Sequence, residues 1–444
     1  MGIKLGELKA EARTLLRAGE TGAALAAFDH ILAANPLDYD SRLKVADLLA
    51  GLGDREGAKE IYQALASHDL RSGHALPAVV AMKQLEALGG NADALVDALS
   101  SLYAHGAPAL AKFAARQAPV DLDSEIPRPD LSKAEDVAAI AARARARALD
   151  FSVFVQYPEQ FLPLPFFSEL PREVFRPVAR ALRLRRMNGG ELVIREGEPG
   201  VAFYLVATGQ VRVFATQAGK QIERGRLHEG ALFGEMSLLT QQPRTASVQV
   251  VDEADILELS RESLAVLTAE VPSLAVVLDK FARERLLKNL LATSPLFRPF
   301  NHQQQLDLIR RFDGHEVAAG TVVIREGDAG QGLFVVLSGE VEVSKHQAGG
   351  GSELSLARLR AGDVFGEMSL LTNQPTSATV TAARNSTILF LARDYFQRLV
   401  EALPTIRQYF VELAQRRAID TNLAVGQDED RPERMTSPDA RVIV

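Results

Sequence analysis

A long internal duplication constrains this chain more than any other feature. The segment VIREGE at residues 193–198 recurs as VIREGD at 323–328, and FGEMSLLT at 233–240 recurs unchanged at 365–372. The first pair lies 130 residues apart and the second pair 132 residues apart. A repeat of this length corresponds to a whole domain rather than to a single supersecondary unit. The larger part of the chain is therefore predicted to hold two copies of one domain.

Each copy is predicted to be a β-domain that helices close. Residues 202–216 and 332–346 are rich in β-branched and aromatic residues, interrupted by glycines. Many short strands joined by glycine turns are typical of a small barrel or a jelly roll. Helical segments follow, and Pro272 and Pro404 divide each of them into a shorter and a longer helix.

A shorter repeat, with a period of 34 residues, occupies the N-terminal part. Gly19 recurs as Gly53, and Ala24 recurs as Ala58. Each unit is predicted to be a helix, a glycine turn and a second helix. The pattern resembles the tetratricopeptide repeat over about residues 5–105. That resemblance implies a curved surface that binds peptides or partner helices. A generic helical bundle is the alternative.

The two repeats define the predicted fold class, a multidomain α+β chain. An α-helical, tetratricopeptide-like region precedes two β jelly-roll domains with flanking helices. The predicted parts are the helical repeats at 1–106, a linker with one helix at 107–162, the β-domains at 163–292 and 293–421, and a disordered polar tail at 422–444.

Composition excludes several classes of function. The chain of 444 residues has 50 Lys and Arg against 57 Asp and Glu, a net charge of −7 that is not typical of a nucleic-acid binder. It has no Cys, which excludes disulfides and thiolate zinc sites, and its His residues lack metal-ligand spacing. No apolar run is long enough to span a membrane. We therefore expect a cytoplasmic protein, from a bacterial source by its Ala-, Leu- and Arg-rich composition, with no nucleic acid, membrane insertion or metal.

The duplicated segment carries a specific family resemblance. Residues 233–248, FGEMSLLTQQPRTASV, are similar to the phosphate-binding cassette of cyclic-nucleotide-binding domains. This family includes regulatory subunits of cyclic-AMP-dependent kinase, cyclic-nucleotide-gated channels and the bacterial catabolite activator. The upstream turn, the strand and the closing helices occur in the family's order in both copies. The resemblance implies a cyclic nucleotide as ligand, cAMP or cGMP, and no cofactor.

The residue types of the first cassette suit this ligand. An arginine forms bidentate, charge-assisted bonds to phosphate, and backbone N–H groups at a helix start can cradle the anion. The resemblance implies that Arg244 holds the phosphate and that Glu235 holds the ribose 2′-hydroxyl. An alternative is that these two residues pair with each other in an empty fold. The predicted ligand residues are Gly234, Glu235, Met236, Ser237, Leu238, Arg244, Thr245 and Ala246.

The second cassette departs from the pattern, because Thr376 stands where the phosphate-binding arginine is expected. Moving a phosphate out of water without a counter-charge is costly. We therefore predict weak or no binding of a cyclic nucleotide there. The site is either a structural pseudo-site or a site for another ligand, such as an uncharged nucleoside. Its residues are Gly366, Glu367, Met368, Ser369, Thr376 and Ser377.

Motifs that would indicate another output are absent. The sequence has no kinase catalytic motifs and no Walker A motif, and too few residues follow Asp420 for a helix-turn-helix. We predict a non-enzymatic sensor and adaptor. It binds a cyclic nucleotide in the first cassette and passes the signal to a protein partner through the helical repeats. The alternatives are a structural scaffold that binds no ligand, and a regulatory subunit that restrains a separate kinase or other enzyme.

Overall fold

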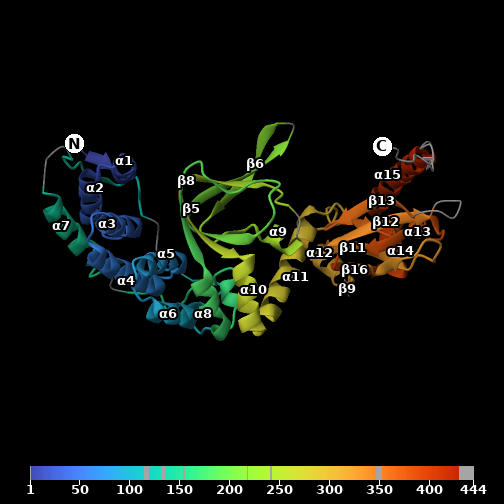
Figure 1. Cartoon of the computed structure of the whole chain (residues 1–444), viewed down its shortest axis with the longest axis horizontal. Helices are drawn as coiled ribbons and strands as arrows, with labels where there is room; N and C mark the ends of the chain where they lie inside the picture. Colours follow the sequence, from blue (N-terminus) through green and yellow to red (C-terminus); the bar gives the residue numbers. More distant parts are fainter. Residues whose placement is uncertain are drawn as a thin grey trace, which may run out of the picture. The chain divides into compact units, whose positions relative to one another are not determined.

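The chain forms two compact units, which are described separately (Figure 1). One unit contains Met1–Leu238 and Gln242–Asp279, and the other contains Leu239–Gln241 and Lys280–Val444. The computed structural model describes residues 2–114, 120–131, 136–153, 156–217, 219–240, 243–346 and 353–429.

The N-terminal unit begins with helices that pack consecutively against one another. They are α1 (Leu5–Arg17), α2 (Thr21–Ala34), α3 (Tyr39–Gly51), α4 (Arg55–Ser72), α5 (Ala75–Ala87) and α6 (Asp93–Tyr103). Gly19 and Gly53, which the 34-residue repeat relates, both adopt a positive φ, at 80° and 96°, in the turns that end α1 and α3. A helical N-terminal region is therefore confirmed, while its assignment to tetratricopeptide repeats stays a prediction.

The segment predicted as a linker folds back onto these helices. Strand β2 (Glu125–Pro127) pairs antiparallel with β1 (Gly2–Lys4) near the N-terminus. Helix α7 (Val137–Leu149) packs against α2, α3 and α4 (Figure 1). Its arginines form ion pairs rather than only a solvated face, since Arg143 and Arg147 both contact the buried Asp29.

A single buried arginine joins α7 to α3. The Arg42 side chain is fully buried, and its guanidinium donates to the carbonyl oxygens of Arg147, Ala148 and Asp150 at 3.1, 2.6 and 2.7 Å. The last carbonyls of a helix have no partner within that helix. Arg42 therefore supplies the donors that the end of α7 lacks, and its charge lies 4.2 Å from the centre of the Phe151 ring.

The first β-domain completes the N-terminal unit. Its sheet has the order β3-β8-β5-β6, with β4 paired to β8 and β7 paired to β5. Its core contains the fully buried Val206, Val211 and Ile256. The elements are η1 (Phe167–Glu169), α8 (Arg172–Ala181), β3 (Arg183–Asn188), β4 (Leu192–Ile194), β5 (Ala202–Gln217), β6 (Lys220–His228), β7 (Leu232–Phe233), α9 (Glu235–Thr240), β8 (Ser247–Ser260), α10 (Arg261–Glu270) and α11 (Ser273–Thr293), which runs on into the second unit.

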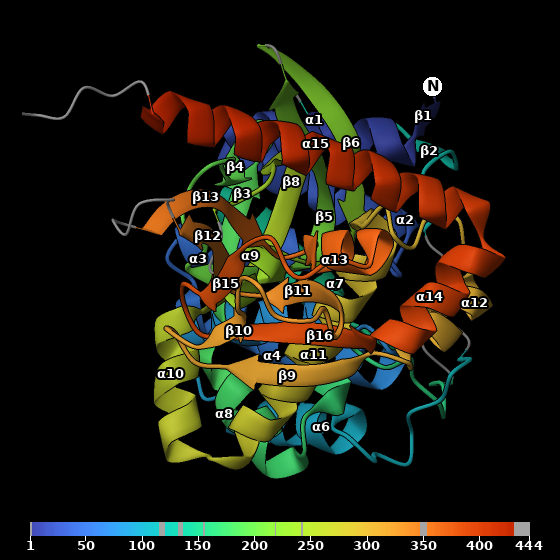
Figure 2. The ribbon, with the colours of Figure 1, turned by 90° about the vertical axis from the view of Figure 1, so that its right-hand side faces the viewer.

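The second unit repeats this arrangement with shorter strands. Its two four-stranded sheets have the orders β10-β15-β12-β13 and β14-β11-β16-β9, and Figure 2 shows β9, β16 and β11 side by side. The elements are α12 (His302–Ile309), β9 (Asp313–Val317), β10 (Val322–Ile324), β11 (Gly332–Ser338), β12 (Glu340–His346), β13 (Glu353–Arg360), β14 (Val364–Phe365), α13 (Glu367–Thr372), β15 (Thr379–Ala382), β16 (Ser386–Ala392), α14 (Arg393–Ala402) and α15 (Pro404–Glu429).

The two copies share one bend. The long strand β5 corresponds to β11 and β12 together, and β8 corresponds to β15 and β16 together. Gly209 and Gly339 lie at the equivalent bends with φ of 82° and 91°. A Cβ at Gly209 would lie 2.1 Å from the carbonyl oxygen of Glu253, so only glycine fits there.

The C-terminal end differs from the expected boundary. A disordered tail was expected from residue 422, but α15 continues to Glu429. Residues 430–444 lie outside the described part of the chain. Among the described residues, no helix is both long enough and apolar enough to cross a membrane.

The Arg42 contact yields a test of the fold. Replacing Arg42 with Met leaves the terminal carbonyls of α7 buried without donors, so the free energy of unfolding should fall by about 3 kcal/mol. Chemical denaturation of the full chain measures this change. Arg145 on α7, which contacts Glu60 near the surface, is the matched control, and Arg145→Met should cost no more than about 1 kcal/mol. Equal losses in the two variants would contradict the role given to Arg42.

Candidate functional site

The first cassette joins β7 to α9 through a glycine that no other residue can replace without strain. Gly234 has a φ of 79°. A Cβ at this position would lie 2.8 Å from Nη1 of Arg244 and 3.2 Å from the Tyr204 ring. The missing side chain therefore lets the arginine reach the start of α9. Gly234 and Arg244, which the sequence analysis placed in one site, are brought together.

Arg244 is held inside the cassette, with 5% of its surface exposed. Its guanidinium donates to the carbonyl oxygens of Gly234 and Ala202, the latter at 2.7 Å. Burial lowers the pKa of Arg244, while Tyr204 and Glu235 act in the opposite direction. A buried guanidinium whose donors meet backbone carbonyls keeps its full positive charge. It therefore offers a cation to an anionic ligand at the start of a helix.

The other predicted residues of this cassette differ in their exposure. Glu235 and Ser237 are buried, while Met236 and Ala246 are half-buried and Thr245 is exposed. The side chain of Leu238 lies outside the described residues. Ser237 packs against the preceding turn so closely that a Cβ at Gly200 would lie 2.5 Å from the Ser237 Cβ.

The second cassette repeats this backbone geometry. Gly366 has a φ of 86°, and Thr376 occupies the place of Arg244. The Thr376 amide donates to the Asp328 carbonyl at 2.9 Å, as the Arg244 amide donates to Glu198 at 2.8 Å. The two cassettes therefore differ in their side chains rather than in their path.

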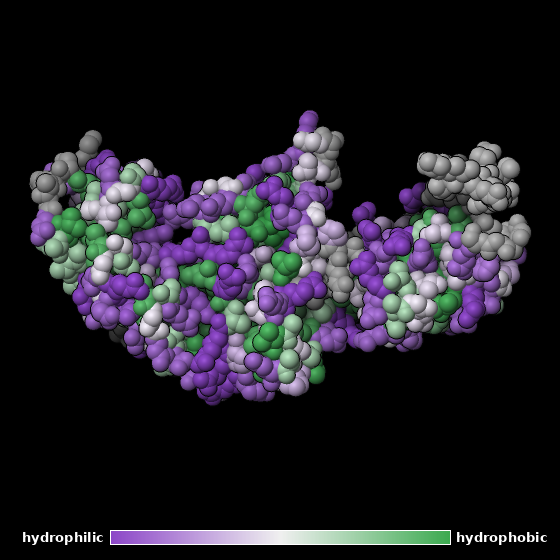
Figure 3. All heavy atoms as spheres, viewed as in Figure 1, coloured by the Kyte–Doolittle hydropathy of each residue, from purple (hydrophilic) through white to green (hydrophobic). Residues whose placement is uncertain are grey.

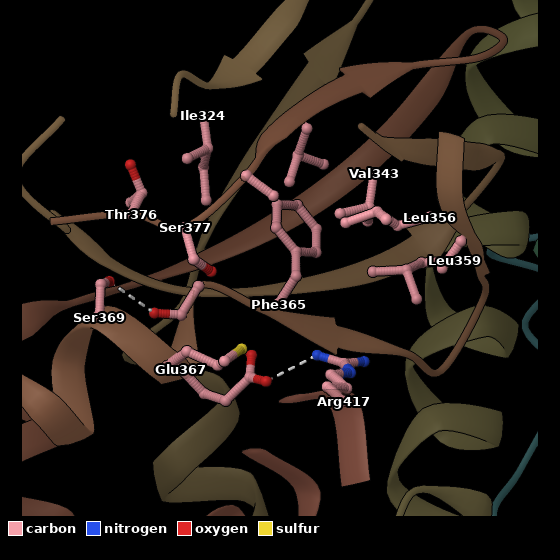
Figure 4. Close-up of a pocket in the computed structure, with 15 residues that line it drawn as sticks. Ile324, Val343, Leu356, Leu359, Phe365, Glu367, Ser369, Thr376, Ser377 and Arg417 are labelled. Atoms are coloured by element: carbon pink, nitrogen blue, oxygen red, sulfur yellow. Dashed lines mark hydrogen bonds and ion pairs between the residues drawn. The ribbon is translucent and has the colours of Figure 1, made fainter. Parts of the chain in front are cut away.

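Thr376 cannot replace the arginine chemically. Its hydroxyl donates to the Arg325 carbonyl oxygen, and in Figure 4 it points away from Glu367. Ser369 is buried and donates to the Gly366 carbonyl oxygen at 3.0 Å, while Ser377 is exposed. None of these groups carries a positive charge.

A cavity of about 310 Å³ lies in the second cassette (Figure 4). Arg417 of α15 lines it and donates to the buried Glu367 carboxylate at 2.8 Å. Most of the remaining wall is apolar, and it includes Ile324, Val343, Leu356, Leu359, Phe365 and Val380. Met368 and Ser377 also line the cavity. It is therefore an apolar space with a carboxylate–guanidinium pair at one side.

Sequence reasoning did not identify Arg417. This residue follows Thr376 by 41 positions, in a helix whose placement against α13 is a tertiary feature. An arginine on a polar helix has no sequence signal that distinguishes it from its neighbours Arg416 and Arg407. Only the packing of α15 selects Arg417 as the residue that contacts Glu367.

A metal site does not emerge from the described ranges, which contain no group of three or more His, Asp or Glu side chains arranged to hold an ion. The chemistry of both cassettes is therefore that of hydrogen bonds, charge and apolar contact.

Comparisons with known proteins agree with this geometry. A family model described as "Cyclic nucleotide-binding domain" matches residues 184–270 and 315–402. The cAMP-dependent protein kinase regulatory subunit of Yarrowia lipolytica is 32% identical over 235 residues, which are 53% of this chain and 58% of that protein. A cGMP-dependent protein kinase of Caenorhabditis briggsae is 27% identical over 244 residues, covering 55% of this chain and 31% of the kinase.

Among solved structures, the regulatory domain of Toxoplasma gondii PKA with cAMP aligns with 56% of this chain and 92% of its own, at 22% identity and a TM-score of 0.28. The chain spans only 58% and 31% of the two curated relatives named above. Both relatives are eukaryotic, so the bacterial source expected from composition stays a prediction. The matched segments coincide with the two β-domains and their cassettes. This chain therefore contains two cyclic nucleotide-binding domains in tandem.

Proposed function

We propose that the chain is a non-enzymatic sensor that binds cAMP or cGMP in its first cassette. The observation that carries this proposal is the buried Arg244 guanidinium at the start of α9, beside the Glu235 carboxylate. In this proposal the arginine holds the cyclic phosphate, and the carboxylate accepts the ribose 2′-hydroxyl. Relatives named for cAMP and for cGMP both match, so the base is left to the binding measurement.

The proposed signal reaches the helical region through β8. This strand begins at Ser247, three residues after Arg244. Further along, its Glu253 pairs with Lys44 of α3 at 3.0 Å and with Arg13 of α1 at 3.6 Å. Movement of the cassette on ligand binding would therefore displace the strand that holds α1 and α3.

A second ion-pair chain joins the same elements. Arg186 of β3 pairs with Asp255 of β8 at 2.9 Å and with Asp47 of α3 at 2.6 Å. In the second domain the corresponding residues are Glu316 and Thr387, which pair in the same register. These charges therefore belong to the copy that meets the helices. They support a role for this contact in transmission to a protein partner.

A kinase is the second candidate for the partner, because the Yarrowia lipolytica relative and a Blastocladiella emersonii relative are both named as cAMP-dependent protein kinase regulatory subunits. In that case the chain would restrain a separate catalytic protein in the cytoplasm until the nucleotide binds.

For the second cassette we propose an uncharged nucleoside. Its cavity is open but holds no arginine at the phosphate position, and its one lining arginine already pairs with Glu367. The apolar wall would receive the base, and Glu367 would accept a ribose hydroxyl. A pseudo-site kept for packing is the competing explanation.

The first prediction concerns ligand affinity. Removing a charge-assisted bond to an anion costs about 1.5–3 kcal/mol, so Arg244→Ala should weaken cAMP or cGMP binding about 10- to 150-fold. Calorimetric titration of the full chain measures this loss. Arg226→Ala, on the exposed strand β6, is the control and should leave affinity within about twofold. Unchanged affinity in Arg244→Ala would refute the site, and no binding of either nucleotide to the unaltered chain would favour the structural scaffold.

The second prediction concerns transmission. The nucleotide should change amide hydrogen exchange in α3 of the unaltered chain, and this change should shrink at least twofold in Glu253→Gln, since the strand then loses its ion pairs to α1 and α3. Glu258→Gln is the matched control, because Glu258 lies on β8 but pairs with Arg185 inside the β-domain. An α3 that does not respond to the nucleotide, or equal responses in the two variants, would exclude this route.

The third prediction concerns the second cassette. Adenosine, guanosine and inosine are titrated into Arg244→Ala, so that only the second site is available. At least one should bind, and Glu367→Ala should weaken it at least about tenfold, since a hydrogen bond to a charged group contributes about 1.5–3 kcal/mol. Glu342→Ala, on the exposed face of β12, is the control. Absence of binding by all three nucleosides would leave the packing explanation.

A further inference from the structure

A cavity of about 890 Å³ lies within the N-terminal unit, and its wall contains none of the cassette residues. Helices α1, α3, α4 and α5 form one side of it. Strand β3 and the bend where β5 pairs with β8 form the other. Figure 3 shows hydrophilic side chains gathered where the helical region meets the first β-domain. The volume is at the upper end of the range of about 300–1,000 Å³ that is typical of ligand pockets.

Most charges that line this cavity are already paired. Arg13 contacts Asp40 at 2.8 Å, and Lys44 contacts Glu253 at 3.0 Å. Asp47 accepts from the Tyr62 hydroxyl at 2.6 Å as well as from Arg186. These pairs hold the two sides of the cavity together, and they leave little charge available for a ligand.

Asp69 is the exception. This residue of α4 is 1% exposed and lines the cavity, on the helix face that also carries Tyr62 and Leu65. Within the described part of the chain, neither of its carboxylate oxygens accepts a hydrogen bond. A buried carboxyl group without partners costs free energy, so its retention requires a reason other than stability.

The surroundings of Asp69 favour a positively charged ligand. Burial raises the pKa of Asp69 well above its usual range; Arg42 opposes this shift, and the negative charge of Glu229, in the turn before β7, adds to it. The carboxyl group therefore lies where a further cation would be stabilised. A guanidinium suits two free oxygens of one carboxylate, because its N–H donors form parallel bonds to both.

We propose that Asp69 anchors an arginine side chain of a peptide from the partner protein. This inference deepens the proposed function and rests on its partner-binding half. A peptide fits better than a free guanidinium compound, because the cavity extends from Asp69 along α1, α3 and α5 and is large enough for several residues. Its paired charges of both signs would flank the peptide, and the arginine would complete the one site that lacks a partner.

Stability gives the first test. Replacing Asp69 with Leu removes a buried polar group that has no partner in the free protein, so the melting temperature of the full chain should rise by about 2 °C or more. Asp47→Leu is the matched control, since Asp47 lines the same cavity but is hydrogen-bonded, and its melting temperature should fall. A fall in Asp69→Leu would show that the carboxyl group is structural and would overturn the proposal.

Binding gives the second test. Random twelve-residue peptides displayed on phage are selected on the immobilised full chain and on Asp69→Asn. Arginine should be enriched at one position with the unaltered chain only. A selected peptide should bind at least tenfold more weakly when Asp69 is replaced with Asn, or when its arginine is replaced with the uncharged citrulline. No enriched peptide, or peptides without a common arginine, would overturn the proposal.

Two further arms separate the explanations. Acetyl-arginine amide that binds as tightly as the selected peptide would point to a free guanidinium compound and overturn the peptide assignment. Titration of Asp69→Asn with cAMP and cGMP should match the unaltered chain, and Arg244→Ala should still bind the peptide. Loss of nucleotide binding alone would therefore refute the sensor, while loss of peptide binding alone would refute this inference.

Discussion

Strand β8 is the element on which the arrangement of the N-terminal unit depends. Its first residue follows the cassette arginine closely, its middle forms the bend against Gly209, and Glu253 and Asp255 at this bend meet the helices. A strand in a sheet is stiff along its length, because its backbone hydrogen bonds fix both neighbours. One continuous element therefore joins the proposed nucleotide site to the proposed partner surface.

The second domain shows what this strand becomes when no helical region meets it. There the same segment is divided into β15 and β16, and the positions of Arg186 and Asp255 are taken by Glu316 and Thr387. The sheet order is nevertheless the same in both copies. The jelly roll thus tolerates a change of charge at this edge, and the ion pairs of the first copy serve the contact with the helices rather than the β-fold.

The two cassettes show how one side chain decides the chemistry of a shared backbone. Both keep the positive-φ glycine and the short helix, so both present backbone N–H groups to a ligand. Only Arg244 adds a full charge, and an anion leaves water readily only toward such a charge. In the other copy α15 supplies Arg417, but that charge is used on Glu367. A site for an anion and a site for a neutral molecule follow from the same fold.

Much of the site was predictable from sequence, because the cassette is local. Gly234, Glu235 and Arg244 lie within eleven residues, and a turn, a helix start and a charged side chain at this spacing determine most of the geometry. The duplication likewise determined the two β-domains, since identical segments at one offset form the same strands. Tertiary packing decided the rest. Arg417, Asp69 and the contact of Glu253 with Lys44 join segments that are distant in the chain, and α15 runs past its expected end. Side chains of these types are ordinary on a polar surface, and only the approach of another element makes one of them a partner and leaves another without one.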